Sequence, residues 1–263
     1  MKKKKVLKKK TTKSSKKSIK GKNPMDTNSL SVKASSDLAN MADVSAWGSQ
    51  ELSSQDIVIP RLLIMQGMSE MVTEGKAKFG DIIDNLEEAV VGSFDTPVEI
   101  IPFKLERVWR VQKASGKGEL IRTIPIVSNP ESPDFNDNMP YDDADKETGE
   151  AIRNFRAFRY YVVLAKDVEE GTFTLPYMVE FKSTSLKAGK KLATTMYTKN
   201  RAAGLSPAAR VFELSLSKQS NDNGTFAVFD VKATRASNKD EQSHAFDWFK
   251  QLGGGNFKVS EEG

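Results

Sequence analysis

The chain has 263 residues, of which 38% are hydrophobic, and it contains no cysteine, which excludes a disulfide framework, thiolate metal sites and a cysteine nucleophile. Its net charge of +5 hides a division, because residues 1–22 hold twelve lysines and no acid. The rest of the chain therefore has 28 Lys and Arg (40 less 12) against 35 Asp and Glu, so the basic balance belongs to the N-terminal segment alone.

Residues 1–52 are rich in Lys, Ser and Thr, and they have too little apolar surface to offset the entropy of ordering. We expect a disordered arm whose lysines, such as Lys8, Lys9 and Lys10, contact nucleic-acid phosphates; a solubilising tail is the alternative. The N-terminus lacks the apolar region of a signal peptide, and no stretch is long and apolar enough for a membrane span. These features predict a cytoplasmic protein, in the host cytoplasm if it is viral, with no membrane partner.

Alternating apolar and polar residues predict several β-strands in the first half of the folded region. Ile57–Gln66 is interrupted by Pro60, which suits an edge strand or an extended entry segment. Pro97–Lys113 is the longest candidate, and its length predicts a bend or bulge near Glu106–Arg107. Glu119–Val127 would be the returning strand.

Residues 128–150 hold eight acids and one lysine among Pro, Asn and Gly, which predicts a mobile surface loop. Such acids could serve as ligands for a hard cation or for a nuclease metal. Their spacing does not match a calcium-binding loop, so we expect a solvated loop and no metal site.

Asn154–Leu164, with the sequence NFRAFRYYVVL, places aromatic and guanidinium groups on both faces of one predicted strand. Proteins that bind single strands stack bases on aromatic rings and hold the backbone with Arg and Lys. If one face of this strand is buried, at least half of the rings belong to the core instead. Parity alone does not say which face is outside.

A strand predicted from Phe173 onward feeds directly into a short basic helix, which the Ser-Thr-Ser run at residues 183–185 can cap. Residues 153–218 hold twelve Lys and Arg against five acids, whereas residues 131–150 hold eight acids against one lysine. We therefore expect a basic, aromatic groove on the strand and helix, with the acidic loop near it or competing for it.

Two further features complete the predicted secondary structure. Arg210–Lys218 and Thr225–Lys232 flank a turn rich in Asn, Asp and Gly, which predicts a hairpin. Asp240–Leu252 has acids in its first turn and glycines after its end, which predicts a terminal helix.

The sequence lacks the motifs of common enzymes. Its one histidine, His244, lies in the predicted terminal helix, and nothing near it resembles a nucleophile elbow. Lys190 follows a glycine, but Thr184 and Lys191 stand where a phosphate-binding loop needs Gly and Ser or Thr. We therefore expect no enzyme, no catalytic residue, no metal and no cofactor.

The order of strands, basic helix and hairpin is that of a five-stranded oligonucleotide-binding (OB) barrel, whose helix lies between the third and fourth strands. The predicted fold is mainly β with few helices: an OB-like barrel of five or more antiparallel strands and an extra C-terminal helix. The predicted domains are an arm at residues 1–52, the OB-like nucleic-acid-binding domain at 53–235 with its loop at 128–150, and a C-terminal helix with a flexible tail at 236–263.

Five segments resemble a group of phage-encoded single-stranded DNA-binding proteins. They are IVIPRLLIMQGMSEMV, KFGDIIDNL, VEIIPFKLERVW, FKSTSLKAGKKL and NDNGTFAVFDV, and they extend from Ile57 to Val231. The resemblance implies a protein that protects or organises single-stranded DNA in phage replication or recombination. It implies replication or recombination proteins as further partners and leaves a homo-oligomer open.

The predicted function is binding of single-stranded DNA through aromatic stacking and Lys and Arg contacts to phosphates. The alternative is a virion or structural protein with a DNA-contacting arm, and a nuclease that uses the acidic cluster is a third hypothesis. The predicted binding residues are Trp109, Arg110, Phe155, Arg156, Phe158, Arg159, Tyr160, Tyr161, Lys182, Lys187, Lys190 and Lys191.

Overall fold

The structure is a computed structural model that describes residues 58–115, 118–172, 175–222, 224–253 and 258–259, all within one compact unit, Gln50–Gly263. The arm lysines Lys8, Lys9 and Lys10 lie outside the described residues. The strands are β1 (Val58–Ile59), β2 (Arg61–Ile64), β3 (Ile82–Asp84), β4 (Ala89–Gly92), β5 (Val98–Lys113), β6 (Leu120–Pro125), β7 (Asp142–Ala144), β8 (Ala151–Leu164), β9 (Tyr177–Lys182), β10 (Arg210–Asn221), β11 (Gly224–Ala236) and β12 (Lys258–Val259). The helices are α2 (Glu70–Thr73), α3 (Ala165–Glu169), α4 (Leu186–Ala193) and α5 (Lys239–Gly253), with a 3₁₀ turn at Ser183–Ser185 and a π-helical segment at Thr194–Asn200.

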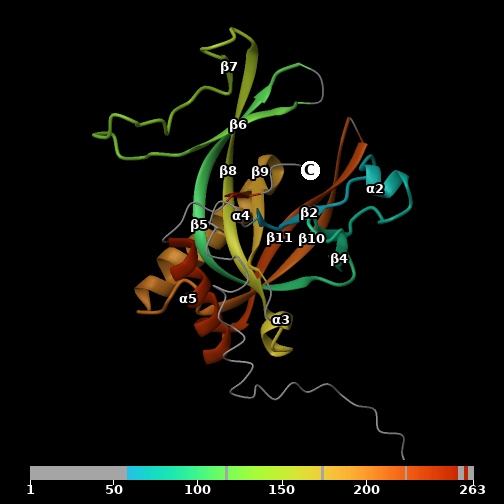
Figure 1. Ribbon diagram of the computed structural model, residues 1–263, viewed down its shortest axis with the longest axis vertical. Helices are drawn as coiled ribbons and strands as arrows, with labels where there is room; N and C mark the ends of the chain where they lie inside the picture. The colour runs from blue at the N-terminus through green and yellow to red at the C-terminus, as the bar shows by residue number, and fades with distance from the viewer. Residues whose placement is uncertain (1–57, 116–117, 173–174, 223, 254–257, 260–263) are drawn as a thin grey trace, which may run out of the picture. The chain divides into compact units, whose positions relative to one another are not determined.

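The described strands form a ten-stranded mixed sheet and a separate parallel pair, β1 with β12 (Figure 1). The order in the large sheet is β11-β10-β5-β8-β9-β2-β3-β4, with β6 beside β5 and β7 beside β8. The expectation of a mainly β fold is confirmed. Two finer expectations are corrected: β2 runs parallel to β9, so the sheet is not wholly antiparallel, and the sheet is open and does not close into a barrel.

The pair β5 and β8 is the longest ladder in the sheet, running from Ile100 opposite Leu164 to Lys113 opposite Ile152. Its register shift falls between Pro102 and Lys104, earlier than the sequence predicted. The far end of this pair carries β6, β7 and the acidic loop (residues 128–150), which project together in Figure 1. The strand expected at Glu119–Val127 therefore extends this projecting part and does not lie on the main strand path.

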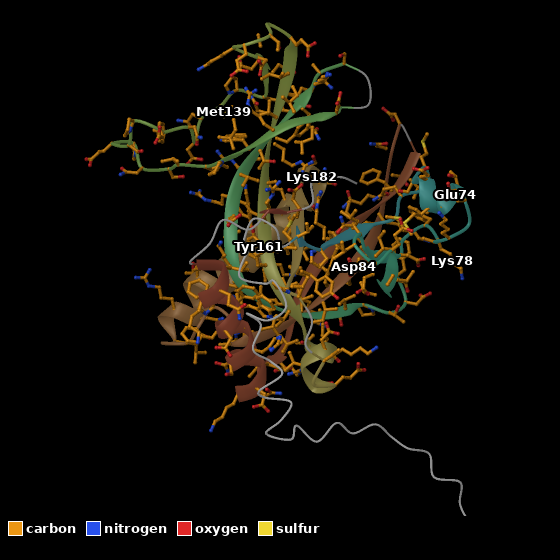
Figure 2. The ribbon with its side chains drawn as sticks, viewed as in Figure 1. Glu74, Lys78, Asp84, Met139, Tyr161 and Lys182 are labelled. Carbon is orange, nitrogen blue, oxygen red and sulfur yellow. The ribbon has the colours of Figure 1, made fainter. Side chains whose placement is uncertain are left out.

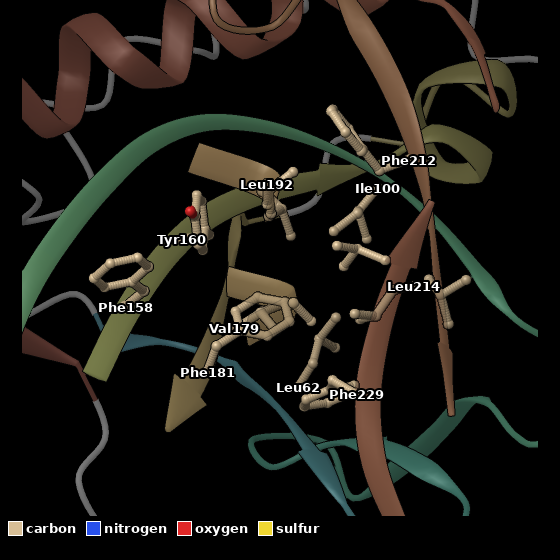
Figure 3. Packing of buried hydrophobic residues seen from close by; sticks show 14 of the residues in the cluster. Leu62, Ile100, Phe158, Tyr160, Val179, Phe181, Leu192, Phe212, Leu214 and Phe229 are labelled. Atoms are coloured by element: carbon tan, nitrogen blue, oxygen red, sulfur yellow. The ribbon is translucent and has the colours of Figure 1, made fainter. Parts of the chain in front are cut away.

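The main hydrophobic core lies between one face of the sheet and helix α4 (Figure 3). Alternate residues of β8, among them Phe158 and Tyr160, point into this core together with Phe181 of β9 and Leu192 of α4. The Tyr160 hydroxyl donates a 2.6 Å hydrogen bond to the Gly189 carbonyl, so its polar end is satisfied although the side chain is fully buried.

The opposite face of the sheet is covered by α5, so both faces of β8 are buried along much of its length. Tyr161 and Val163 lie in this second core with Trp248 of α5. The first turn of α5 is fixed by a capping box: the Glu241 amide donates to the Asn238 side chain at 2.9 Å, and the Asn238 amide donates back at 2.7 Å. None of the described helices has the length and hydropathy needed to cross a lipid bilayer.

β11, at one end of the strand order, approaches the segment after β2 without pairing with it. The side chain of Gln66, just after β2, donates to the Ala227 carbonyl of β11 at 2.9 Å and accepts from the Ala227 amide at 3.0 Å. The side-chain amide of Gln66 thus makes the two hydrogen bonds with Ala227 that the backbone of a neighbouring strand would make. β2 pairs with the edge of β9 that β8 leaves free, so β11 does not pair there.

Other predicted elements agree with the structure in kind and differ in extent. The hairpin is confirmed as β10 and β11, and the terminal helix as α5. Pro60 does not mark an edge strand, because β2 after it pairs with both β3 and β9. The strand expected from Phe173 is described only from Tyr177 as β9, since residues 173–174 lie outside the described part.

We expect Gly189→Ala to destabilise the fold by about 1–3 kcal/mol through overpacking. A Cβ at Gly189 would lie 2.8 Å from the Cβ of Phe181 and 3.3 Å from a ring carbon of Phe158. This clash should outweigh the gain of about 1 kcal/mol that alanine brings to a helix. Urea denaturation measures the change, with Gly67→Ala as control because no atom lies within 4 Å of its added Cβ. Equal stability of both variants would contradict the close packing of α4.

Candidate nucleic-acid interface

A buried ion triad ties together the three central strands of the sheet. Glu180 of β9 accepts from Arg159 of β8 at 2.9 Å and contacts Arg110 of β5 at 2.9 Å. All three side chains are at least nine-tenths buried. Burial by itself would raise the pKa of Glu180, but the two guanidinium groups hold it below its usual value. Glu180 therefore stays charged at neutral pH.

The triad belongs to a larger group of positive charges. Partial burial lowers the pKa of the Lys182 ammonium, and the guanidinium groups of Arg110, Arg61 and Arg159 lower it further, while Glu180 raises it. The three guanidinium groups thus lie close enough to Lys182 to disfavour its charge, and Glu180 partly offsets them. We call Arg61, Arg110, Arg159 and Lys182 the cation cluster.

A groove of about 660 Å³ opens beside the cation cluster. Three cluster members and Glu180 line it, together with the segment after β2, the turn at Ser183–Ser185 and residues 225–229 of β11. Among the described residues, Nε of Arg110 is buried without a hydrogen-bond partner, although Arg110 lines the groove. Ser183 at the rim has φ of 47°, which is uncommon for a residue other than glycine.

An aromatic pair lies next to Arg110 on the same face of the sheet. Phe155 is the register partner of Arg110 on β8 and is half-buried. Its ring meets Tyr141 edge-on with centroids 5.2 Å apart, and Tyr141 is 52% exposed. This pair offers accessible ring surface within reach of the cation cluster.

Four of the five aromatic rings predicted to stack bases are buried. Phe158 and Tyr160 lie in the main core, and Tyr161 lies under α5, with its hydroxyl donating to Glu106 at 2.9 Å. Burial raises the pKa of both tyrosine hydroxyls above the usual value. Trp109 is 6% exposed. The cores on the two faces of the sheet bury Phe158, Tyr160 and Tyr161, and the acidic loop covers Trp109, so Phe155 is the one of the five predicted rings that is not buried.

The acidic loop is held to basic side chains of β6 and β8 by hydrogen bonds and ion pairs. Arg156 donates to the Asp137 backbone carbonyl at 2.6 Å and to its carboxylate at 2.9 Å, and its guanidinium lies 5.0 Å from the centroid of the Trp109 ring. Arg122 pairs with Asp145 at 2.6 Å. Hydrogen bonds from Thr148 and Arg122 lower the pKa of Asp145 to about 2. The loop is thus attached to basic side chains of the strands, and its carboxylates are used locally.

The structure brings together three of the predicted binding residues, Arg110, Arg159 and Lys182, in the cation cluster. The predicted lysines of α4 are not part of the cation cluster. Lys187 and Lys190 are exposed on α4, and Lys191 donates to the Val231 carbonyl at 2.5 Å.

Two residues at the candidate interface were missed by reasoning from the sequence. Arg61 stands inside an apolar run, and a lone charge in such a run is a signal that could have identified it. Tyr141 lies in the acidic loop, and no periodic pattern connects it with Phe155; only the pairing of β7 with β8 brings them together. Within the described residues, no three acidic or histidine side chains converge as ligands of a metal ion.

The chain belongs to the family described as Pam3 phage gp34-like protein, whose model matches residues 25–258. No curated protein matches the chain. No solved structure matches it. The family assigns the chain to phage proteins, and what it binds has to be argued from its own side chains.

We expect Glu180→Gln to lower the free energy of unfolding by about 3–5 kcal/mol, because it leaves two buried guanidinium groups without their carboxylate. Glu119→Gln is the control: its ion pair with Lys113 has a carboxylate that is 73% exposed, and its loss should cost at most about 1 kcal/mol. Urea denaturation at neutral pH measures both changes.

The difference in stability between wild type and Glu180→Gln should depend on pH. The pKa of Glu180 is lowered in the folded state, so its stabilising effect is present above the unfolded pKa and is lost as the pH falls through the folded one. The stability difference between wild type and Glu180→Gln should therefore shrink below a pH of about 4.3, the unperturbed pKa of a glutamate. A difference that stays constant down to acid unfolding would contradict the charged triad.

Proposed function

We propose that this phage protein binds single-stranded DNA in the groove beside the cation cluster. The observation that carries the proposal is the set of side chains that meet there: among the described residues, Arg61, Arg110 and Lys182 line the groove together with the carboxylate of Glu180. A phosphate bound there could accept charge-assisted hydrogen bonds from these side chains. Single strands are commonly held by basic grooves of this kind.

The strand order supports an OB-like nucleic-acid-binding unit within the open sheet. β5 pairs with both β8 and β10, β8 pairs with β9, and α4 lies between β9 and β10 in the chain. Numbered from β5, Arg159 and Lys182 of the cation cluster lie on strands two and three, the strands that bind oligonucleotides in OB-folds, and Arg110 lies on strand one beside them. In this interpretation β2 to β4 are an addition on the edge of β9, and the returning strand β6 belongs to the loop between the first two strands.

Base stacking would take place on Phe155 and Tyr141, which replace the larger aromatic surface expected from the sequence. Their pair lies beside Arg110, so one nucleotide can place its base on a ring while its phosphate reaches the cluster. Phe226, half-buried in the groove wall, is a further candidate for ring contact. This arrangement implies little sequence preference, because each base presents a π-face.

A DNA-contacting arm on a structural protein is the competing proposal, and it differs in where the affinity resides. We expect a chain that begins at Ser53 to bind a fluorescein-labelled oligo-dT in fluorescence anisotropy, more weakly than the full chain but with measurable affinity. If all binding disappears with residues 1–52, the groove is not the binding site and the arm accounts for it.

We expect Lys182→Gln to weaken oligo-dT binding and to reduce the slope of log affinity against log salt by about 0.7, the value for one lost phosphate contact on a single strand. Lys182 is exposed at the end of β9, between Met139 of the acidic loop and Asp84 of β3 in the view of Figure 2. Lys166→Gln is the matched control, because Lys166 is an exposed lysine on α3, at the opposite end of β8. An equal loss in both variants would point to non-specific charge and contradict the groove.

We expect Phe155→Ala and Tyr141→Ala each to cost about 1–3 kcal/mol in oligo-dT binding, the contribution of one base–ring stack. Phe246→Ala is the control, since Phe246 is 57% exposed on α5. Thermal unfolding of each variant separates lost binding from lost folding. Unchanged affinity in both ring variants would show that the pair does not stack bases.

A further inference from the structure

The acidic loop holds a carboxylate over a basic and aromatic site that is distinct from the groove. We propose that Arg107, Trp109 and Arg156, here called the capped site, form a second phosphate- and base-binding site for single-stranded nucleic acid. The Asp137 carboxylate occupies this site, and nucleic acid must displace it. The inference rests on the proposed function, which it extends from the groove to the projecting part of the sheet.

The contacts of Asp137 are those that a phosphate would make at the same place. One carboxylate oxygen accepts from Arg156 at 2.9 Å, and the other accepts from the Ser128 hydroxyl at 2.8 Å. Ser128 in turn accepts from Arg107 at 2.5 Å. One guanidinium group thus contacts the anion directly and a second reaches it through the Ser128 hydroxyl, an arrangement suited to the oxygens of a phosphodiester.

The capped site also contains the surface needed for a base. The guanidinium of Arg156 stacks over the Trp109 ring at 5.0 Å, and the loop closes over this pair through a 2.9 Å hydrogen bond from the Trp109 indole to the Asn136 carbonyl. Stacked arginine and tryptophan side chains are a common platform for unpaired bases. The loop residue Asn136 therefore shields Trp109, a predicted ring that lies outside both main cores.

The cap can open at low cost. The Arg156 and Asp137 side chains are 35% and 26% exposed, so water reaches their ion pair and reduces its contribution to stability. Displacing the Asp137 carboxylate alone breaks its hydrogen bonds from Arg156 and Ser128, and both Arg156 and Asp137 would be hydrated once separated. The buried Arg110–Glu180 pair, at 6% and 4% exposed, could not exchange partners so readily.

The capped site lies where a strand leaving the groove would arrive. Lys182, the last residue of β9, is the register partner of Ala157 on β8, and Arg156 is the next residue along β8. Neighbouring residues of a strand point to opposite faces, so Arg156 faces away from the cation cluster. Nucleic acid that passes around the end of β9 at Lys182 would therefore meet Arg156 on the other face.

The test uses the full chain and two probes, tripolyphosphate and a labelled oligo-dT. We expect Asp137→Asn, which removes the competing charge and keeps the side-chain shape, to tighten the binding of both probes by roughly tenfold, which is the equivalent of one charge-assisted contact. Tryptophan fluorescence should respond to tripolyphosphate in this variant, and the response should disappear when Trp109→Phe or Arg156→Gln is added.

Asp134→Asn is the matched control, because Asp134 is exposed on the same loop and its substitution changes the net charge equally. If Asp134→Asn tightens binding as much as Asp137→Asn, the effect is general electrostatics and the inference is overturned. If oligo-dT binding depends on Lys182 but Asp137→Asn changes nothing, the inference fails and the proposed function stands. If tripolyphosphate perturbs Trp109 but no oligo-dT binds, the proposed function fails, and with it the assignment of the capped site to nucleic acid.

Discussion

The charge on Glu180 is the constraint on which the central part of the molecule depends. It lies on β9 and binds guanidinium groups from β8 and β5, so one carboxylate crosslinks three strands. Its burial is tolerated because two cations surround it, and it in turn offsets the cost of burying them. Lys182 follows two residues after Glu180 and lines the groove. Folding and the proposed anion binding would thus depend on the same group.

The overall acidity of the folded part says little about where an anion would bind. Many of its carboxylates are used locally: Asp137 binds Arg156, Asp145 binds Arg122, and Glu241 binds Arg235 at 2.7 Å. Because the two charges of each pair cancel at a distance, these pairs contribute little to the electrostatic field at the groove. The basic stretch at residues 153–218 contains Arg159 and Lys182 of the cation cluster, whereas Arg61 and Arg110 lie outside that stretch.

Much of the fold follows from local patterns, and the candidate site follows from them only in part. Alternation over β5, β8, β10 and β11 locates the strands, and the turn between β10 and β11 identifies their hairpin. The same alternation could not place Tyr160 and Tyr161, because it assumes one buried face and β8 has two. The groove depends on pairings between residues far apart, such as β2 beside β9 and Tyr141 against Phe155, which no short window of sequence contains.

The open sheet is what makes a groove available at all. If β11 paired directly with β9, as in a closed barrel, backbone hydrogen bonds would fill the space now lined by residues 225–229. Gln66 instead satisfies Ala227 through one side chain, which holds the two edges together without filling the space between them. β2 occupies the edge of β9, and β3 and β4 extend the sheet beyond it, so β11 does not pair with β9. An addition to the sheet thus leaves open a space that a closed barrel would lack, next to the side chains best able to hold an anion.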